Sequence, residues 1–388
     1  MKYNFKAKNY DAICVGAGYA GAVFARRAAE YGKRILVLEK RNHIAGNAYD
    51  LPDEKGVLIH LYGPHIFHTN RRDVFEFLSR FTEWNGYQHT VVASTSYGEF
   101  PVPFNLNSIE LVYGDESQKY IDALISTFGE NVKVTITELK KANNPLLIEL
   151  ADFVYENVFL HYTEKQWGLT PEEIDPNTIA RVPVFCGRDN RYFTDVYQGL
   201  PTKGYTAMFE RMLDHLNIET ACGVDAKEVL EFTKEGKINL CGDEFEGKVV
   251  YSGALDELFD HKLGRLPYRT LDFEFEDIDA ECFQSHGTVN YTVSEDFTRI
   301  TEFKYMTKQK IDGVTAIVRE YSRQAEPGDT PYYAIICPEN NSLYAKYAEL
   351  ASSYDGFIPL GRLAEYKYYN MDAITARALE TADKTYGD

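Results

Sequence analysis

The stretch 10–40, YDAICVGAGYAGAVFARRAAEYGKRILVLEK, contains two short apolar runs with a glycine-rich turn and a segment of helical spacing between them. The runs at 11–16 and 34–39 are rich in branched apolar residues, which suits buried parallel strands. The segment between them ends at Gly32, a residue type that commonly follows the last turn of a helix. We therefore predict a strand–helix–strand unit that begins a parallel sheet.

The turn in this unit carries a G-x-G-x-x-G pattern, and an acidic residue, Glu39, ends the second strand. The glycines permit a tight turn, a close approach of the backbone to a pyrophosphate, and close packing of the helix. The helix N-terminus then faces the anion, and Glu39 is placed to bind an adenosine ribose. The alternative is a glycine-rich turn with a solvated glutamate. We assign to a dinucleotide site Gly16, Gly18, Tyr19, Ala20, Gly21, Glu39 and Lys40, and a glutamate at 39 disfavours NADP.

The overall composition narrows the class of protein and its partners. The formal net charge of −18 over 388 residues argues against nonspecific binding to nucleic acid or to an anionic membrane, because both need a positive surface. An acidic chain that binds an anionic substrate must gather a few arginines locally. There is no apolar run long enough to span a membrane, and the six cysteines show no paired spacing, so we expect a cytoplasmic protein.

The nature of the dinucleotide follows from two segments far apart in the chain. EKRNHIAGNAYD at 39–50 resembles the second flavin motif of the FAD-containing amine-oxidase-like superfamily. A further flavin-like signature runs from GRL at 361–363 to NMD at 370–372, where a helix N-terminus is expected near the isoalloxazine. We therefore predict FAD. Beyond the first loop, its expected contacts are Gly46, Asn47, His65, Ile66, Arg362, Tyr369, Asn370, Met371 and Asp372.

The residue patterns change from strand-like to helical and back along the chain, which indicates an α/β protein with mixed α+β character. Residues 91–106 read as a hairpin that turns at Tyr97-Gly98, and 107–180 reads as longer helices. VNYTV, RITEFKYM and VTAIVREYS read as consecutive strands of an antiparallel sheet. We expect a Rossmann-like FAD-binding domain (1–106, 200–265 and 355–388), an inserted helical domain (107–180), and an antiparallel-sheet substrate domain (181–199 and 266–354).

Six blocks of the sequence together resemble the UDP-galactopyranose mutase family of the bacterial type. They are HIAGNAYD (43–50), YGPHIFHT (62–69), HYTEKQWG (161–168), RVPV and DNRYF within 181–193, TRITEFKYM (298–306), and PYY with GRLAEYKYYNMD within 331–372. The resemblance implies an enzyme that interconverts the pyranose and furanose forms of a nucleotide-bound hexose without net oxidation. It also implies a homodimer that supplies cell-surface polysaccharide synthesis.

The same resemblance implies the mechanism. The N5 atom of reduced FAD attacks the anomeric carbon of the sugar and displaces UDP, so that a flavin–sugar adduct forms and the sugar recloses through another oxygen. Arg181 and Arg299 match the arginines that clamp the diphosphate, and a guanidinium suits phosphate oxygens better than an ammonium does. From the residues alone, Arg181 could merely cap backbone and Arg299 could pair with Glu302.

Aromatic and amide residues complete the substrate site that the resemblance implies. Tyr192, Tyr333 and Tyr368 match tyrosines that donate to phosphates, and Asn290 matches an asparagine that contacts the substrate. Phe159, Tyr162 and Trp167 match the segment that cradles the uridine. In a chain with 29 tyrosines, a plain packing role for any single one is the alternative.

The histidines admit two interpretations. His65 and His68 have a spacing that metal ligands can show, but no carboxylate or cysteine cluster stands near them in the sequence. We therefore predict no metal and place both beside the flavin. The resemblance gives His65 a catalytic role near N5.

Several positions depart from the family pattern and leave the substrate open. His89 stands where bacterial members carry an asparagine near the substrate, Phe185 replaces an arginine, Ala334 replaces a proline, and Asn370 replaces an aspartate. The substrate is then UDP-galactose or a related nucleotide sugar, UDP-N-acetylgalactose or dTDP-fucose. Two further classes share the fingerprint: a flavin amine oxidase or desaturase, and a non-catalytic FAD-binding protein.

Overall fold

The amino-terminal segment begins a parallel sheet of five strands, as the sequence predicts. The structure is a computed structural model and describes residues 3–167, 183–293 and 295–387. Neighbouring strands of this sheet all run parallel. In spatial order they are β11 (Ile218–Cys222), β2 (Ile35–Glu39), β1 (Ala12–Val15), β15 (Lys248–Tyr251) and β21 (Phe357–Pro359). Every residue of β2 is buried, as expected of a strand that is covered on both faces.

Helix α1 (Tyr19–Glu30) joins β1 to β2 and completes the predicted strand–helix–strand unit. Gly32 follows with φ +78°, a left-handed conformation that glycine adopts without strain. The last helix of the chain, α13 (Met371–Tyr386), lies along α1. Arg27 of α1 donates to Asp383 of α13 at 2.5 Å, so the two ends of the chain are tied together over the parallel sheet.

The second sheet has seven strands, and all its neighbouring pairs are antiparallel except β17 with β6. In spatial order the strands are β20 (Tyr333–Ala334), β16 (Tyr268–Ile278), β19 (Thr315–Gln324), β18 (Arg299–Glu302), β17 (Thr288–Tyr291), β6 (Val91–Thr95) and β7 (Gly98–Val102). The three predicted strands are therefore present and adjacent. RITEFKYM, however, is strand only to Glu302, and the short helix α11 (Phe303–Thr307) follows. Phe303 and Met306 are both buried, and a spacing of three residues places them on one face of a helical turn.

The predicted hairpin of β6 and β7 forms, with Thr95 opposite Gly98. It does not belong to the five-stranded sheet that holds the glycine turn, although it lies within residues 1–106, which we expect to be part of the FAD-binding domain. The hairpin instead extends the seven-stranded sheet, because β6 pairs in parallel with β17. This pairing joins segments almost two hundred residues apart, which local sequence patterns cannot reveal.

The helical segment packs around a core of its own. Its helices are α3 (Leu106–Tyr113), η3 (Gly114–Glu116), α4 (Ser117–Phe128), α5 (Ile136–Lys141), α6 (Pro145–Val154), η4 (Tyr155–Leu160) and α7 (His161–Trp167). Side chains cap three of these helices, since Asn105, Thr135 and Asn144 each accept a hydrogen bond from a first-turn backbone N–H. The short strand β9 (Val184–Phe185) pairs with β8 (Lys133–Val134). This places part of the 181–199 segment against the helical core.

The remaining elements connect these three groups. They are η1 (Ala7–Asn9), η2 (Gly46–Ala48), β3 (Asp50–Pro52), β4 (Leu58–His60), β5 (Phe67–Thr69), α2 (Arg72–Ser79), β10 (Tyr197–Gly199), α9 (Tyr205–Leu213), η5 (Ala226–Glu228), β12 (Leu230–Phe232), β13 (Ile238–Leu240), β14 (Asp243–Glu244), α10 (Leu255–Leu258) and α12 (Pro338–Ser352). β3 pairs with β4, and β5 pairs with β10. The β3–β4 pair lies between the glycine turn and the hairpin. The β5–β10 pair joins that stretch to the segment before α9.

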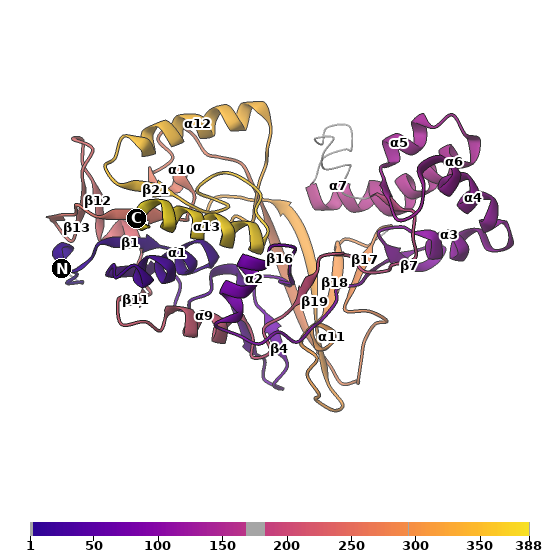
Figure 1. The fold of residues 1–388 in the computed structure, drawn as a ribbon, viewed down its shortest axis with the longest axis horizontal. Helices are drawn as coiled ribbons and strands as arrows, with labels where there is room; N and C mark the ends of the chain where they lie inside the picture. The colour runs from indigo at the N-terminus through magenta and orange to yellow at the C-terminus, as the bar shows by residue number, and fades with distance from the viewer. Residues whose placement is uncertain (1–2, 168–182, 294, 388) are drawn as a thin grey trace.

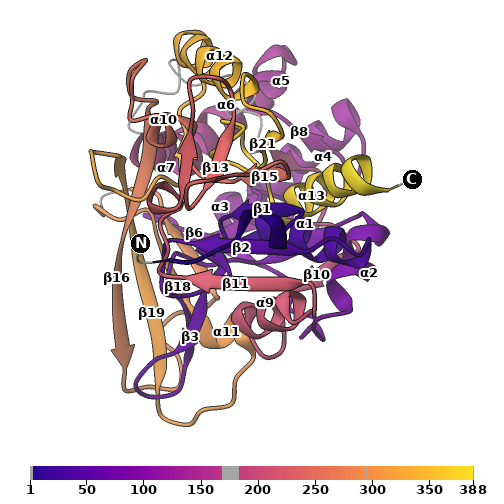
Figure 2. The same cartoon turned by 90° about the vertical axis from the view of Figure 1, so that its left-hand side faces the viewer.

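The three groups lie side by side along the long axis of the molecule. In Figure 1 the parallel sheet with α1 and α13 is on the left, the helical group is on the right, and the long strands β16 and β19 stand between them. Figure 2 shows β16 and β19 running past one edge of the parallel-sheet region. Across the described residues, no helix has the length and apolar character needed to cross a bilayer. All six cysteines lie in the described segments and are unpaired.

Candidate active site

The glycine turn and the loop after β2 meet at the first turn of α1. Gly18 is the N-cap residue of α1 and has no side chain to cover the first amides. A Cβ added to Gly46 would lie 2.9 Å from the Cα of Gly18, and one added to Gly21 would lie 1.9 Å from the carbonyl oxygen of Gly16. Contacts this short require glycine. The turn therefore presents bare backbone and a helix N-terminus, which together suit a pyrophosphate.

Glu39 lies at the end of β2 with only 6% of its surface exposed. Its two carboxylate oxygens accept hydrogen bonds from the backbone N–H groups of Ala17 and Arg41, both at 2.9 Å. These bonds fix the carboxylate beside the glycine turn and leave lone pairs for further donors. Its position fits a ribose acceptor. Lys40 is exposed, and its Nζ atom lies 4.0 Å from a carboxylate oxygen of Glu257.

The segment before α13 reaches the same region from the other end of the chain. Arg362 donates to the carbonyl oxygen of Tyr369 at 2.5 Å. Asn370 is the N-cap residue of α13 but its side chain does not cap the helix. The side chain of Asp372 is turned toward β5, where it accepts from Thr69 at 2.9 Å. The segment lies against the first turn of α1, since a Cβ added to Gly361 would come within 3.4 Å of the Ala20 Cβ.

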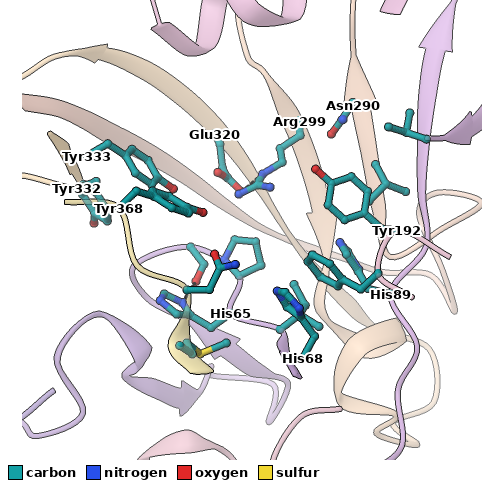
Figure 3. A pocket seen from close by; sticks show the side chains of 18 of the residues that line it. His65, His68, His89, Tyr192, Asn290, Arg299, Glu320, Tyr332, Tyr333 and Tyr368 are labelled. Atoms are coloured by element: carbon teal, nitrogen blue, oxygen red, sulfur yellow. Dashed lines mark hydrogen bonds and ion pairs between the residues drawn. The ribbon is translucent and has the colours of Figure 1, made fainter. Parts of the chain in front are cut away.

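Between the parallel sheet, the seven-stranded sheet and the helical group lies a pocket of about 690 Å³. Figure 3 shows its charged and aromatic side chains converging from several elements. Most of the lining residues are polar or aromatic: Asn47, Tyr62, Gly63, Pro64, His65, Ile66, His68, His89, Val91, Val102, Pro103, Lys133, Pro183, Tyr192, Phe193, Leu271, Asn290, Arg299, Glu320, Tyr332, Tyr333, Arg362, Tyr368, Asn370 and Met371. Six of the predicted cofactor residues line this pocket together with most of the predicted substrate residues, whereas the glycine turn and Glu39 do not line it. The six are Asn47, His65, Ile66, Arg362, Asn370 and Met371.

The central cation of this pocket is Arg299 on β18. Its Nε atom donates to Oε1 of Glu320 on β19 at 2.7 Å, and Glu320 has only 2% of its side chain exposed. Arg299 does not pair with Glu302, whose oxygens accept from the N–H groups of Phe283 and Gln284 instead. Arg299 is thus held by a buried carboxylate and placed on a rigid strand.

Asn290 and three tyrosines surround this cation. Asn290 lies directly opposite Arg299 across β17 and β18, so both side chains are on the same face of the sheet. The guanidinium of Arg362 lies 4.9 Å from the ring centre of Tyr368 and 5.4 Å from that of Tyr333. Burial raises the pKa of Tyr333, which keeps its hydroxyl a proton donor. Tyr192 lines the pocket beside His89.

Two further histidines, His68 and His89, line the pocket. Nδ1 of His68 lies 3.0 Å from Oδ2 of Asp195, and the His68 ring stacks on Phe193 with ring centres 3.6 Å apart. His89 is 4% exposed, and its Nδ1 atom lies 3.2 Å from the hydroxyl of Tyr87. Burial, with the nearby charge of Arg299, lowers the pKa of His89 to about 3. His89 is therefore a neutral hydrogen-bonding group at physiological pH.

Comparisons with known proteins decide the family. A family model described as UDP-galactopyranose mutase matches residues 157–368, and one for an NAD(P)-binding Rossmann-like domain matches residues 14–81. The chain is 36% identical to a probable UDP-galactopyranose mutase of Klebsiella pneumoniae, over 97% of this chain and 94% of that protein. The chain belongs to the UDP-galactopyranose mutase family. It is therefore an enzyme of the isomerase class, and its cofactor is FAD.

Other members of the UDP-galactopyranose mutase family match equally well. The chain is 35% identical to a dTDP-fucopyranose mutase of Escherichia coli over 95% of this chain and 97% of that protein. It is 34% identical to a UDP-galactopyranose mutase of Mycoplasma genitalium over 97% of this chain and 95% of that protein. Relatives that act on different sugars are thus nearly equidistant from this chain.

Solved structures agree on the fold. A crystal structure of a reduced UDP-galactopyranose mutase matches with a TM-score of 0.69 over 97% of this chain and 94% of that chain, at 15% identity. A putative protoporphyrinogen oxidase from Exiguobacterium sp. 255-15 matches with a TM-score of 0.62 at 12% identity, over 97% and 98% of the two chains. The mutase and this oxidase therefore share one architecture with the chain, and the fold by itself does not separate them.

The glycine turn, Glu39 and the N-terminus of α13 fit the FAD of a UDP-galactopyranose mutase family member. A Cβ on Gly46 would clash with the Cα of Gly18 at 2.9 Å, so bare backbone lies where a pyrophosphate would bind. Tyr19 and Ala20 are buried in the first turn of α1 and pack in the core, and Tyr369 packs beside that core. The side chains of these three residues therefore pack in or against the core.

Some predicted site residues fall elsewhere. Arg181 and the side chains of Tyr162 and Trp167 lie outside the described residues. Phe159 is 1% exposed and belongs to the core of the helical group rather than to the pocket lining. Phe185 in β9 and Ala334 in β20 also do not line the pocket. Of the departures from the family pattern, only His89 and Asn370 face the cavity.

Sequence reasoning missed several pocket residues. Glu320 had one available signal, since it follows the apolar residues Ala316 and Val318 at alternate positions of the strand AIVRE and so shares their face. Asp195 and Phe193 had none, because their role depends on the packing of the 189–196 loop against β5. Among the described residues, no three histidine, cysteine or acidic side chains gather in a way that could hold a metal.

Proposed function

We propose that this protein interconverts the pyranose and furanose forms of the sugar in a nucleotide sugar, with UDP-galactose as the first candidate. The observation that carries the proposal is Arg299, which is anchored by the buried Glu320 in a pocket that adjoins the FAD cradle. An anionic diphosphate is the ligand that such a cation suits, in a chain whose net charge is −18. The names of the relatives support the same chemistry.

In this proposal Arg299 holds the diphosphate while the bond to the sugar is exchanged. Glu320 occupies the Nε edge of the guanidinium, which directs the opposite edge away from β19. The hydroxyls of Tyr333 and Tyr368 add neutral donors on the side of Arg362. We further propose that Arg181 supplies a second cation to the same diphosphate. Together these groups offset the charge that develops on the departing diphosphate.

Bound in its reduced form, FAD would supply the nucleophile that takes the sugar from the diphosphate. The chain's own part is to keep the diphosphate close for its return and to limit the access of water. His65 and His89 are neutral at physiological pH, because burial lowers the pKa of each to about 3. Neutral rings beside the sugar add no charge that would compete with the arginines for the diphosphate.

The identity of the sugar centres on His89. The neutral imidazole lies beside Tyr192 and Phe193, with ring centres 5.6 and 5.7 Å away. Its side chain is longer than the asparagine expected at this position in bacterial members and leaves less room on that wall. This difference favours a smaller sugar substituent there and keeps dTDP-fucose, which lacks the 6-hydroxyl, as the second candidate substrate. UDP-N-acetylgalactose, with its larger substituent, is the third.

The experiment that tests this function is a conversion assay with dithionite-reduced protein. UDP-galactofuranose, UDP-N-acetylgalactofuranose and dTDP-fucofuranose are incubated separately, and the pyranose products are quantified by chromatography. We expect conversion of at least one, and the ratios of kcat/KM rank the sugars. If all three are inert while the protein holds reduced FAD, the proposed function is wrong.

Two further expectations accompany this function. We infer a homodimer, which sedimentation velocity of the purified protein tests directly, with a monomer as the contradicting result. We also infer that the protein works in the cytoplasm and supplies cell-surface polysaccharide synthesis. The unpaired state of all six cysteines supports a reducing compartment, and fractionation of the source cells tests the location.

A further inference from the structure

His60, the last residue of β4, is fully buried although it carries a polar ring. Its Nδ1 atom accepts a hydrogen bond from the backbone N–H of His65 at 3.0 Å. A ring that accepts at Nδ1 carries its proton on Nε2 when it is neutral. That Nε2 atom has no hydrogen-bond partner among the described residues. The ring instead faces the aromatic rings of Tyr205 and Phe303, with centres 5.6 and 5.7 Å away.

A buried polar group without a partner is unfavourable, and such groups are rare in native proteins. An apolar side chain would fill this aromatic environment without leaving a ring N–H unpaired. What the histidine adds is the Nδ1 acceptor for His65. The carbonyl oxygen of His60 also accepts from Gly63 at 3.3 Å, so His60 closes the whole 60–65 turn through both its backbone and its ring.

A second residue holds His65 from the other side. The hydroxyl of Tyr205, which is fully buried, donates to the carbonyl oxygen of His65 at 3.1 Å. Asp50 caps the helix that Tyr205 begins, because its carboxylate accepts from the N–H groups of Tyr205 and Thr206 at 2.6 and 2.8 Å. Asp50 is also the cross-strand partner of His60 in the β3–β4 pair. The two holding residues are therefore linked to each other.

The orientation of the His65 ring follows from this fixed backbone. Nδ1 of His65 lies 2.8 Å from the carbonyl oxygen of Gly63, so Nδ1 is the donor and Nε2 carries the lone pair. Burial lowers the pKa of His65 to about 3, and the ring remains neutral. His65 lines the pocket beside Asn370 and Met371, at the N-terminus of α13. An acceptor therefore faces the cavity on its cofactor side.

We propose that His60 and Tyr205 are positioning residues that clamp the His65 backbone and thereby fix its ring acceptor beside the bound flavin, favouring the reduced flavin. This inference rests on the proposed function, in which the reduced flavin is the working state. A reduced flavin carries ring N–H groups that the oxidised ring lacks. Hydrogen bonds to the ring nitrogens are among the ways in which a protein tunes a flavin, so a fixed acceptor stabilises the reduced form.

The test measures the midpoint potential and the visible spectrum of the bound FAD in the parent protein and four variants. Tyr205→Phe removes only the hydroxyl, and His60→Phe removes the acceptor while filling the space. We expect both to disfavour the reduced form at least tenfold, which corresponds to about 30 mV for a two-electron couple. His60→Asn retains an acceptor near the Nδ1 position and should stay close to the parent. In the conversion assay the first two should lower kcat and leave KM unchanged.

Tyr347→Phe is the matched control. Tyr347 is also fully buried and also donates to a carbonyl oxygen, that of Gly264 at 2.7 Å, but it lies in a different core. If Tyr205→Phe shifts the potential and spectrum no more than Tyr347→Phe does, the inference is overturned, even if His60→Phe fails to fold. If the potential shifts as expected but the parent converts no nucleotide sugar, the clamp stands and the proposed function fails.

Discussion

Arg299 and Glu320 are direct neighbours across β18 and β19, and the Nε atom of Arg299 donates to Oε1 of Glu320 at 2.7 Å. Asn290 lies on the other side of Arg299, as its partner across β17. Three adjacent strands thus present an amide, a guanidinium and a carboxylate in one row. A sheet fixes such a row more rigidly than loops do, so the diphosphate would meet a cation whose position is already set.

This row predicts the effect of neutralising Glu320. In Glu320→Gln the ion pair with Arg299 becomes a hydrogen bond from the guanidinium to a neutral amide, which we expect to cost about 1–2 kcal/mol of transition-state stabilisation, or roughly 5- to 30-fold in kcat/KM. Steady-state kinetics with the preferred nucleotide sugar measure the change. Glu274→Gln, which removes an exposed ion-pair partner on β16, is the control and should leave kcat/KM within twofold. Equal kinetics for both variants would contradict the role of Glu320.

The tyrosines predict a loss in binding of the substrate. Tyr333→Phe and Tyr368→Phe each remove one hydroxyl donor, worth about 0.5–1.5 kcal/mol, so the dissociation constant of UDP should rise roughly 2- to 12-fold. Isothermal titration with UDP and the FAD-loaded protein measures it. Tyr344→Phe serves as control, because that hydroxyl donates to the carbonyl oxygen of Ala364 outside the pocket. UDP affinity that is unchanged in both pocket variants would rule out these hydroxyls as phosphate donors.

The glycine turn predicts two different outcomes for substitution by alanine. A Cβ at Gly21 would lie 1.9 Å from a backbone oxygen, whereas one at Gly18 would meet Gly46 at an ordinary 3.5 Å. Gly18→Ala should therefore fold but bind FAD at least tenfold more weakly, because the methyl group occupies the approach to the pyrophosphate. Gly21→Ala should be destabilised as well. Thermal unfolding of the apoprotein and FAD titration separate the two effects, and a Gly18→Ala protein with parental FAD affinity would argue against this cradle.

The buried histidines predict how stability depends on pH. The pKa values of His60, His65 and His89 are each lowered to about 3 by burial, whereas an unfolded chain takes up these protons near pH 6.5. Between these limits the unfolded state binds more protons, so the free energy of unfolding falls as the pH falls, by about 1.4 kcal/mol per pH unit for each histidine. Urea unfolding at pH 7, 6 and 5 measures the slope. His89→Asn should lower this slope by about 1.4 kcal/mol per pH unit. An unchanged slope would mean that His89 is not buried and neutral.

Much of the fold could be predicted from the sequence because its signals are local. The strand–helix–strand unit at 10–40 depends on spacing and glycine positions within one segment, and the structure reproduces it with β1, α1 and β2. The strands VNYTV and VTAIVREYS carry their own alternation. The hairpin of β6 and β7 is predictable locally, but the sheet that it joins is not, because its partner β17 lies almost two hundred residues away.

The site was less predictable, because its members meet only through the order of the strands. Glu320 becomes the partner of Arg299 through the register of β18 and β19, while Glu302, much nearer in sequence, turns to the 283–284 backbone. Phe159 could not be placed from the sequence either, because the sequence does not tell whether an apolar residue on a helix faces a pocket or a core. The clamp of His60 and Tyr205 joins two segments that no motif connects.

The most direct test of the central claim is the conversion of UDP-galactofuranose by the FAD-loaded protein, followed by NMR in the reduced and the oxidised state. The proposal predicts that UDP-galactopyranose accumulates only with the reduced protein, and that the flavin absorbance is the same before and after many turnovers. If UDP-galactofuranose fails, the same assay is run with dTDP-fucofuranose and UDP-N-acetylgalactofuranose. No ring-form exchange with any of the three, or turnover that consumes reduced flavin stoichiometrically, would contradict the assignment of a nucleotide-sugar mutase.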